Sequence, residues 1–324
     1  MSLLDHYDAL LFDLDGTVYR GEEVIDAAPA AVAATHRAGV TVRFVTNNAS
    51  RGPDEVARHL TALGIPARPD EVSTSAQAAA QVLAEKVTGT VLIVGSASLE
   101  HEVRQVGLHP TRTADDDVVA VVQGLSKDTG WRDLAEACVA LNTGVLWVAC
   151  NVDPTLPTER GQLPGAGSFV AALRTATGRE PIVAGKPAAP LMVEAVRAAN
   201  ADHALAIGDR LDSDIDGAIA AGLDSLLVMS GVTTAAQLLA ADTRPTYLAA
   251  DVAAVTEPRE RLAVGEQADW SVEDGTVRHR GDGEPDPFTL LRALAATPPG
   301  GRFEAADDAA RTALAHLGLG DGLA

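Results

Sequence analysis

Short runs of apolar residues, many of them β-branched, alternate with alanine-rich segments along most of the chain. The strand-like runs are residues 8–12, 41–45, 90–94, 118–122, 145–149, 182–184, 204–207 and 225–228. Helices are expected between them, among them residues 27–38, 53–63 and 169–177. Strands that alternate with helices form parallel sheets, because the crossover between parallel strands is long enough to hold a helix. The alternation therefore predicts an α/β fold with a Rossmann-like, doubly wound parallel sheet.

The composition limits the partners and the surroundings that suit this chain. A net charge of −20 disfavours nucleic acid and anionic membrane surfaces, so an anionic ligand needs a locally positive or metal-loaded site. No apolar run approaches the roughly 20 residues of a membrane helix, and the N-terminus lacks a basic, apolar leader pattern. Cys138 and Cys150 form no CxxC pair. We expect a cytoplasmic protein that binds neither nucleic acid nor membrane.

Two aspartates, Asp13 and Asp15, follow the first strand-like run. In an open α/β sheet, ligands bind at the C-terminal ends of the strands. Residues two apart on a strand point to the same side, so these carboxylates repel each other unless a metal ion, a shared proton or both intervene. The alternative is an ordinary acidic turn, which Gly16 also suits.

Thr46, Asn47 and Asn48 end the second strand-like run. A hydroxyl group followed by amides suits the oxygens of a phosphoryl group, especially at a helix N-terminus. Taken alone, these residues are more typical of an ordinary helix cap.

Lys186 follows another strand-like run and lies between Gly185 and Pro187. Its charge can neutralise a phosphate and nearby carboxylates. The segment is not a P-loop, because Pro187 stands where that motif requires serine or threonine. The alternative is a surface lysine in a turn.

Three acidic residues, Asp209, Asp212 and Asp214, follow the run 204–207. So many carboxylates at a strand end are costly without a cation. Hard oxygen ligands with no histidine or cysteine nearby point to Mg²⁺ and away from zinc. Asp209 is best placed to bind the ion directly, Asp214 to bind it or support a ligand, and Asp212 to cap the next helix. The alternative is an acidic helix start.

In this order, the four motifs resemble those of the haloacid dehalogenase-like phosphatases. That family combines Asp-x-Asp with Gly-Thr, a serine or threonine, a lysine, and Gly-Asp with further acids. The segment between Thr46 and Lys186 resembles the α/β cap of the subclass that includes 4-nitrophenylphosphatase-like and phosphoglycolate phosphatase-like enzymes. The run from Asn151 and Asp153 to residue 168 is similar to that subclass's cap loop, which makes both residues candidates for substrate binding.

The resemblance also divides the chain, whose 324 residues are more than one core usually contains. We expect a catalytic core at residues 1–75 and 181–250, an inserted α/β cap at residues 76–180, and a small α+β extension at residues 262–324.

The extension resembles the small acetyltransferase-like domain fused to some glycerol-3-phosphate phosphatases of this subclass. Residues 270–278 suit a hairpin around Asp274-Gly275, and residues 288–296 and 305–317 suit helices. The extension lacks the glycine-rich pyrophosphate loop of an acetyltransferase. We therefore expect it to have a packing role or to form a homodimer contact.

The resemblance implies phosphoryl transfer in two steps. Asp13 would attack phosphorus and form an aspartyl phosphate, splitting one hard step into two. Asp15 would protonate the leaving alcohol and then accept a proton from water. Mg²⁺ would be bound by Asp13, the backbone oxygen of Asp15 and Asp209, with Asp214 as a further ligand or support.

The other motif residues, namely Thr46, Asn47, Asn48 and Lys186, would hold the phosphoryl oxygens. Closure of the cap would favour small phosphomonoesters over phosphoproteins. We expect glycerol 3-phosphate as the substrate, because polar loops and few aromatic residues suit a small polyol better than a ring. The alternatives are 2-phosphoglycolate or another small metabolite, an isomerising phosphomutase, and, from a different class, a non-catalytic regulator that binds a phosphorylated metabolite.

Overall fold

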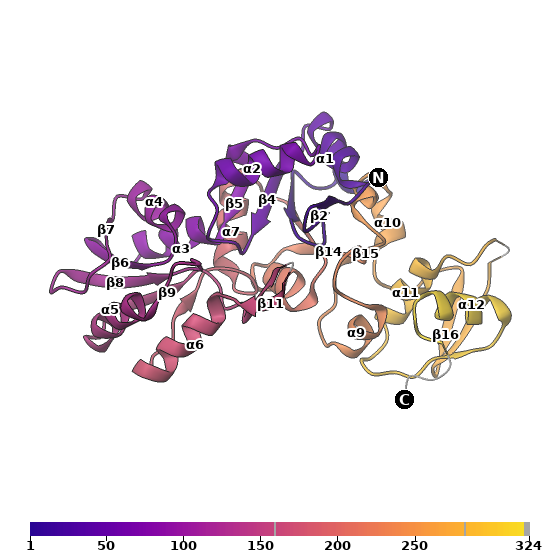
Figure 1. Ribbon diagram of the computed structural model, residues 1–324. Helices are drawn as coiled ribbons and strands as arrows, with labels where there is room; N and C mark the ends of the chain where they lie inside the picture. The colour runs from indigo at the N-terminus through magenta and orange to yellow at the C-terminus, as the bar shows by residue number, and fades with distance from the viewer. Residues whose placement is uncertain (159, 282, 321–324) are drawn as a thin grey trace. The chain divides into compact units, whose positions relative to one another are not determined.

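The computed structural model describes residues 1–158, 160–281 and 283–320 (Figure 1). The chain divides into two compact units. The first unit consists of Met1–Val42, Leu63–Pro66 and the chain from Ala201 onward, and the second of Arg43–Ala62 and Ala67–Asn200. Within the described ranges, no helix is both long enough and apolar enough to span a bilayer.

Four parallel strands belong wholly to the first unit. In spatial order they are β15 (Tyr247–Ala249), β14 (Asp224–Val228), β13 (Ala204–Gly208) and β1 (Ala9–Asp13). Their residues are almost all buried, which explains why they appear in the sequence as continuous apolar runs. β1 and β13 are neighbours, with Phe12 opposite Ile207. The residues that follow these two strands therefore emerge side by side.

Short helices and turns complete this part of the first unit. They are η1 (Leu3–Asp5), α1 (Ala28–Arg37), the π-helical turn η3 (Leu211–Ile215), α8 (Asp216–Ala220), α9 (Ala235–Ala240) and η4 (Val252–Thr256). A small antiparallel ribbon of β2 (Tyr19–Arg20) and β3 (Glu23–Val24) comes soon after β1. Gly16 has a φ of 95°, which lets the chain leave β1 sharply.

The end of the chain forms a small α+β extension within the first unit. The short helix α10 (Arg259–Leu262) leads into it. Its elements are β16 (Trp270–Glu273), β17 (Thr276–His279), α11 (Pro287–Ala295), β18 (Glu304–Ala305) and α12 (Asp308–His316). β16 and β17 form the predicted hairpin, and Asp274 and Gly275 both have positive φ, as a type I′ turn requires. β18 adds to β17 in parallel.

The extension packs on the apolar core of the first unit. Leu290 and Leu294 of α11 belong to the same buried cluster as Leu238 of α9 and Leu248 of β15. Arg292, also on α11, is buried, and its Nε donates a hydrogen bond of 2.7 Å to the carbonyl oxygen of Leu248. The extension thus shares one continuous core with the strands that it covers.

Five parallel strands form a sheet that lies wholly in the second unit. In spatial order they are β12 (Ile182–Val183), β9 (Leu146–Ala149), β8 (Val118–Gln123), β6 (Thr90–Val94) and β7 (His109–Thr111). Helices α5 (Trp131–Asn142) and α6 (Ala166–Thr177) cover one face, where Leu141 and Leu173 join the cluster that contains Trp147. Helices α3 (Ser75–Ala84) and α4 (Ala97–Gln105) lie on the opposite face (Figure 1).

The second unit also contains the end of β4 (Thr41–Thr46), which pairs in parallel with β5 (Val72–Thr74). Its remaining elements are α2 (Pro53–Ala62), η2 (Pro69–Glu71) and α7 (Ala189–Ala199). The predicted fold class, α/β with parallel Rossmann-like sheets, is confirmed.

The prediction of one long loop from residue 151 to residue 168 is wrong in part. The segment contains an antiparallel ribbon of β10 (Thr155–Thr158) and β11 (Gly161–Pro164), and α6 begins at Ala166. Proline and glycine concealed these strands, since both residues usually interrupt a sheet. Here Pro164 pairs at the end of a two-stranded ribbon, where its missing N–H breaks no interior hydrogen bond.

Candidate functional site

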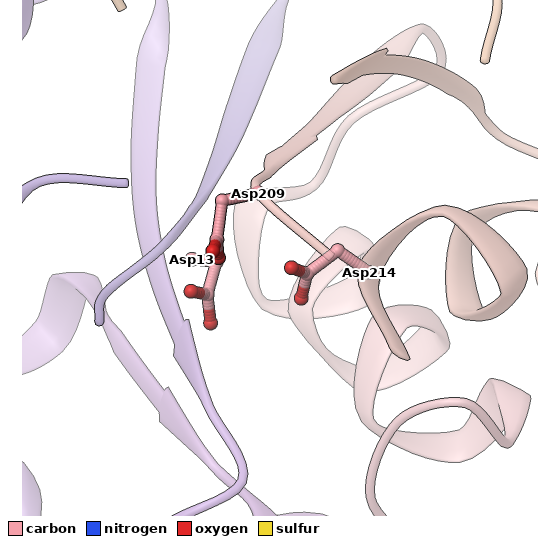
Figure 2. A group of neighbouring side chains, drawn as sticks. All are labelled: Asp13, Asp209 and Asp214. Carbon is pink, nitrogen blue, oxygen red and sulfur yellow. The ribbon is translucent and has the colours of Figure 1, made fainter. Parts of the chain in front are cut away.

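Three carboxylates meet at the C-terminal edge of the first unit's sheet. Asp13 is the last residue of β1, Asp209 directly follows β13, and Asp214 lies in the turn η3. One oxygen from each lies within 4.8 Å of the others, and the three side chains point toward one another (Figure 2). Asp13 is half-buried, and Asp209 and Asp214 are buried. The predicted acidic residues of two separate motifs thus form one group.

The local fold explains why Asp214 joins this group. The turn η3 is π-helical, a form that often occurs at functional sites. The N–H of Asp214 donates to the carbonyl oxygen of Arg210 at 3.0 Å, and the N–H of Arg210 donates back to Asp214 Oδ2 at 3.0 Å. This reciprocal pair holds the Asp214 carboxylate at the strand end.

Glycines make room for the carboxylates. A Cβ atom at Gly16 would lie 2.4 Å from Asp209 Oδ2, and one at Gly231 would lie 2.0 Å from the same atom. At Gly208, a Cβ atom would lie 2.3 Å from the Cβ of Asp214. Side chains do not tolerate contacts this short, so the acidic group is enclosed by positions that only glycine fills without displacement.

The loop after β14 also supports the acidic group. The N–H of Val232 donates to Asp209 Oδ2 at 2.6 Å, and Ser230 Oγ donates to the carbonyl oxygen of Gly16 at 2.9 Å. Our sequence reasoning missed this loop. Its signal was Gly231, which comes soon after the end of β14 as Gly16 comes soon after the end of β1.

The group fits a magnesium ion. All three donors are carboxylates, the hard oxygen ligands that Mg²⁺ prefers. Three like charges so close together repel one another, and a divalent cation removes that repulsion. The side chain of Asp15 is exposed and lies outside the group, and its Oδ1 accepts a hydrogen bond of 3.3 Å from the N–H of Gly21. The prediction that Asp15 offers a metal only its backbone oxygen stays a prediction.

Asp212, the third acid of its motif, also lies outside the group. Its side chain is 71% exposed and bonds to Arg210, with Nε–Oδ1 and Nη2–Oδ2 distances of 3.0 and 2.9 Å. The hydrogen bonds from Arg210 lower the pKa of Asp212. The expected helix-capping role is not seen, because α8 has no side-chain cap. The structure therefore distinguishes Asp214 from Asp212.

A second polar group lies in the second unit and is centred on Asn47, which directly follows β4. Asn47 Oδ1 accepts the N–H of Lys186 at 2.8 Å, and its Nδ2 donates to the carbonyl oxygen of Lys186 at 3.0 Å. The same Nδ2 lies 3.3 Å from Asp153 Oδ2. Asn151 Nδ2 donates to the carbonyl oxygen of Asn47 at 2.7 Å. Residues from three predicted motifs are thus connected through one asparagine.

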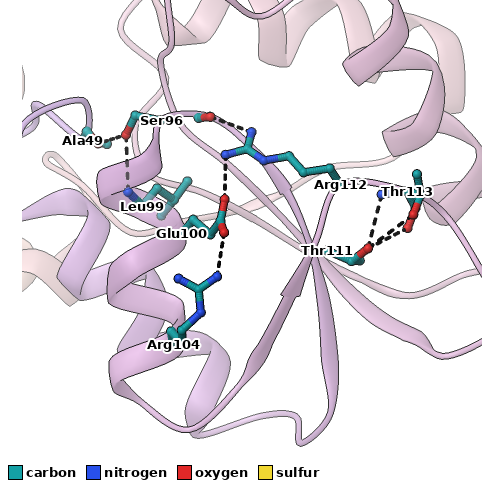
Figure 3. Close-up of polar contacts among 9 residues, drawn as sticks. Ala49, Ser96, Leu99, Glu100, Arg104, Thr111, Arg112 and Thr113 are labelled. Atoms are coloured by element: carbon teal, nitrogen blue, oxygen red, sulfur yellow. Dashed lines mark hydrogen bonds and ion pairs between the residues drawn. The ribbon is translucent and has the colours of Figure 1, made fainter.

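Two serines immobilise the loop that begins at Asn47. Ser75 Oγ donates to the carbonyl oxygen of Asn47 at 2.6 Å. Ser96 Oγ donates to the carbonyl oxygen of Ala49 at 3.0 Å (Figure 3). Ser96 is also the N-cap of α4, where it accepts the N–H of Leu99 at 3.3 Å. Neither serine was predicted to belong to the site, although a serine before a helix, as Ser96 is, is a recognised capping signal.

Charged side chains support the end of β6, where Ser96 lies (Figure 3). Arg112 donates to the carbonyl oxygen of Gly95 at 2.8 Å and to Glu100 Oε2 at 3.0 Å. Glu100 also accepts from Arg104 at 2.6 Å. The hydrogen bonds from Arg104 and Arg112 lower the pKa of Glu100. The loop that contacts Ala49 is therefore itself held in place.

The remaining predicted residues of this group differ in exposure. Lys186 and Thr46 are buried, and Asn48 is exposed. Thr46 Oγ1 accepts the N–H of Asn48 at 3.1 Å, and Asn48 Oδ1 accepts from the N–H and Oγ of Ser50 at 2.8 and 2.7 Å. Thr46 and Asn48 thus order the loop locally, and their contact with a phosphoryl group stays a prediction.

A haloacid dehalogenase-like hydrolase model matches residues 10–109, and a HAD-hydrolase-like model matches residues 183–255. D-glycerol 3-phosphate phosphatase of Mycobacterium tuberculosis is 47% identical over 98% of this chain and 96% of its own length. A crystal structure of glycerol phosphate phosphatase from the same organism, in complex with magnesium, has a TM-score of 0.92 at 49% identity and covers 98% of this chain and 99% of that chain.

A more distant relative matches less of the chain. An acid sugar phosphatase of Staphylococcus saprophyticus is 34% identical over 80% of this chain and 100% of its own length. The whole of that relative therefore finds a counterpart here, whereas about a fifth of this chain finds none there.

Proposed function

Because this chain belongs to the haloacid dehalogenase-like hydrolase family, we propose that it is a Mg²⁺-dependent phosphatase whose substrate is glycerol 3-phosphate. The observation that carries the activity is the convergence of Asp13, Asp209 and Asp214 within 4.8 Å at adjacent strand ends. The substrate is supported by the relative named D-glycerol 3-phosphate phosphatase, which is similar over 98% of this chain.

We assign the chemistry to the first aspartate pair. Asp13, half-buried at the end of β1, attacks phosphorus and takes the phosphoryl group as an aspartyl phosphate. Asp15, whose side chain is exposed, protonates the leaving alcohol and afterwards takes a proton from the water that hydrolyses the intermediate. Dividing the roles in this way requires only one of the two carboxylates to be a nucleophile.

We assign the metal to Asp13, Asp209 and Asp214, with the backbone oxygen of Asp15. When bound there, Mg²⁺ supplies positive charge that offsets the negative charge of the carboxylates and the phosphoryl group. The glycines around Asp209 and the N–H of Val232 fix the ligand carboxylates beforehand, so that little reorganisation is needed on binding.

We assign the holding of the phosphoryl oxygens to residues of the second unit, namely Thr46, Asn47, Asn48 and Lys186. The buried Lys186 supplies positive charge in a protein of net charge −20, which otherwise repels an anionic substrate. Asn151 and Asp153 lie in the loop that we assign to recognition of the rest of the substrate.

Further proposals concern the setting of the enzyme. We propose that it acts in the cytoplasm on a small phosphorylated metabolite, and the net charge of −20 disfavours nucleic acid and anionic membranes as partners. The domain division into a core (residues 1–75 and 181–250), a cap (76–180) and an extension (262–324) is kept as a proposal. The packing of α11 on β15 and α9 favours a packing role for the extension, and a homodimer through it is the alternative.

The second candidate substrate class is supported by the acid sugar phosphatase relative. A phosphatase for another small metabolite, such as 2-phosphoglycolate, would use the same carboxylates and lysine. A non-catalytic regulator would need neither Asp13 nor Asp15 as reactive groups.

A panel of phosphate esters tests the proposal. Full-length protein with Mg²⁺ is incubated with glycerol 3-phosphate, 2-phosphoglycolate, sugar phosphates, a nucleotide and pyridoxal phosphate, and released inorganic phosphate is measured. We expect glycerol 3-phosphate to give the highest kcat/KM and chelation of the metal to abolish turnover. A higher kcat/KM for another ester overturns the substrate, and binding of an ester without release of phosphate from any of them overturns the enzymatic function.

A further inference from the structure

The side chain of Asn47 meets the main chain of Lys186 on both its donor and its acceptor. Oδ1 accepts the N–H of Lys186 at 2.8 Å, and Nδ2 donates to its carbonyl oxygen at 3.0 Å. One carboxamide thus pairs with both polar groups of one residue, as a neighbouring strand would. The pair joins residues that are 139 positions apart in the chain. Asn47 thereby fixes the main chain from which the buried lysine projects.

The atoms around this pair are packed so closely that a side chain at Gly185 would clash with them. A Cβ atom at Gly185 would lie 2.6 Å from Asn47 Oδ1 and 2.5 Å from the carbonyl oxygen of Cys150. The carboxamide therefore lies directly against the glycine that precedes Lys186. Lys186 itself is only 3% exposed, so a small shift of its main chain moves the ammonium group inside a close-packed region.

The carboxamide also contacts the loop assigned to substrate recognition. Asn47 Nδ2 lies 3.3 Å from Asp153 Oδ2. The N–H of Asp153 donates to Asn151 Oδ1 at 3.1 Å, and its carbonyl oxygen accepts the N–H of Gly167 at 2.8 Å. Nδ2 has two hydrogens, so it serves Lys186 and Asp153 together. The lysine and the loop are therefore attached to the same nitrogen.

We propose that Asn47 is a positioning residue, which sets the place of Lys186 and couples it to the loop that carries Asp153. In this role its side chain acts through the lysine, by way of its two hydrogen bonds to the main chain of Lys186. Displacement of the loop weakens the bond of Nδ2 to Asp153 and changes how firmly Lys186 is held. The kinetic consequences of this inference rest on the proposed function, whereas its structural consequence, the placement of Lys186, does not.

Lysine labelling tests the positioning independently of activity. Wild type, Asn47→Ala and Asn47→Asp are treated with an amine-acylating reagent, and modification of Lys186 is measured by mass spectrometry. The Asp substitution keeps the size of the side chain but removes both donations of Nδ2. We expect labelling of Lys186 to be at least fivefold faster in both variants. Unchanged labelling in both overturns the proposal, whether or not the protein is a phosphatase.

Two controls separate local displacement from unfolding. Cys150 is fully buried, and burial raises the pKa of its thiol to about 12, so in the folded chain it resists thiol reagents at neutral pH. Faster labelling of Lys186 supports the proposal in a variant whose Cys150 stays unreactive. If Cys150 becomes reactive in Asn47→Ala, the labelling of Lys186 and Cys150 in Asn47→Asp decides instead. Asn142→Asp, an exposed asparagine at the end of α5, is the matched control for the substitution and leaves Lys186 protected.

Kinetics then test the coupling. We expect KM for glycerol 3-phosphate and the inhibition constant of inorganic phosphate to rise at least tenfold in Asn47→Ala. The Mg²⁺ concentration for half-maximal activity should stay within twofold, because the acidic group belongs to the other unit. Gly185→Ala, which places a methyl group against Asn47 Oδ1, should reproduce the effect. An equal loss of Mg²⁺ affinity overturns the specific role of Asn47.

Discussion

In the first unit, Asp13, Asp209 and Asp214 bring like charges within 4.8 Å of one another; in the second unit, the contacts around Asn47 join donors to acceptors. The acidic group is enclosed by glycines and backbone N–H groups that hold the carboxylates in place against their repulsion. The amide group stabilises itself, because each hydrogen bond satisfies both partners.

This difference indicates what each of the two groups is suited to do. Carboxylates that repel one another are suited to bind a cation, because its charge offsets their repulsion. A group already complete in hydrogen bonds is suited to hold a lysine in place before substrate arrives. We therefore expect the effects of substitutions in the acidic group to depend on Mg²⁺. The effect of substituting Asn47 should not depend on Mg²⁺.

The largest effect is expected from filling the glycine enclosure of the acidic group. In Gly231→Ala the new methyl group would lie 2.0 Å from Asp209 Oδ2, so the carboxylate must move. We expect the Mg²⁺ concentration for half-maximal activity to rise at least tenfold, measured by phosphate release at varied Mg²⁺. Gly265→Ala is the matched control, because a methyl group there meets no described atom within 4 Å. An equal response of the two variants would contradict the assigned enclosure.

A moderate effect is expected on thermal stability. Asp214→Asn removes one of three repelling charges, so we expect the metal-free protein to gain about 1 kcal/mol, or roughly 2 °C in Tm. The rise in Tm that Mg²⁺ gives the wild type should largely disappear in this variant. Asn47→Ala should instead lower Tm, and the decrease should be equal in the presence of Mg²⁺ and in the presence of a chelator. Thermal unfolding under both conditions measures this, and a loss of metal-free stability in Asp214→Asn would contradict the repulsion assigned to the three carboxylates.

The smallest effect is expected from Asp212, the acid that lies beside the group but outside it. Its pKa is lowered in the folded state by the hydrogen bonds from Arg210, so its stabilising contribution is present above the unfolded pKa and is lost as pH falls through the folded pKa. The pair is exposed, so the contribution at neutral pH is at most about 1 kcal/mol. Urea unfolding should show Asp212→Asn slightly less stable than wild type at pH 7, and the difference should shrink as the pH falls below about 4. A difference that grows toward low pH would refute the assignment.

Much of the acidic group was predictable because it depends on strand order alone. Asp13 and Asp209 each follow a buried apolar run, and neighbouring parallel strands bring such ends together. The choice between Asp212 and Asp214 was not predictable, because it depends on the π-helical turn that directs one carboxylate inward and leaves the other on Arg210.

The contacts of the second group were harder to predict. Asn47 and Lys186 were recognised as polar residues at strand ends, but the pairing of a side-chain amide with a main chain 139 residues away leaves no local pattern. The same holds for Ser75 and Ser96, whose bonds to the Asn47 loop depend on how the helices α3 and α4 are placed. The β10–β11 ribbon was missed because its prolines and glycines resemble a loop.

The most direct test of the account is the rate of phosphate release from glycerol 3-phosphate by Asp13→Asn beside the wild type, at saturating Mg²⁺. The substitution keeps the shape of the side chain and removes the nucleophilic charge. We expect a loss of roughly 10³-fold or more in kcat, while Asp212→Asn stays within about twofold of the wild type. A kcat for Asp13→Asn within tenfold of the wild type would contradict the assignment of Asp13 as the nucleophile.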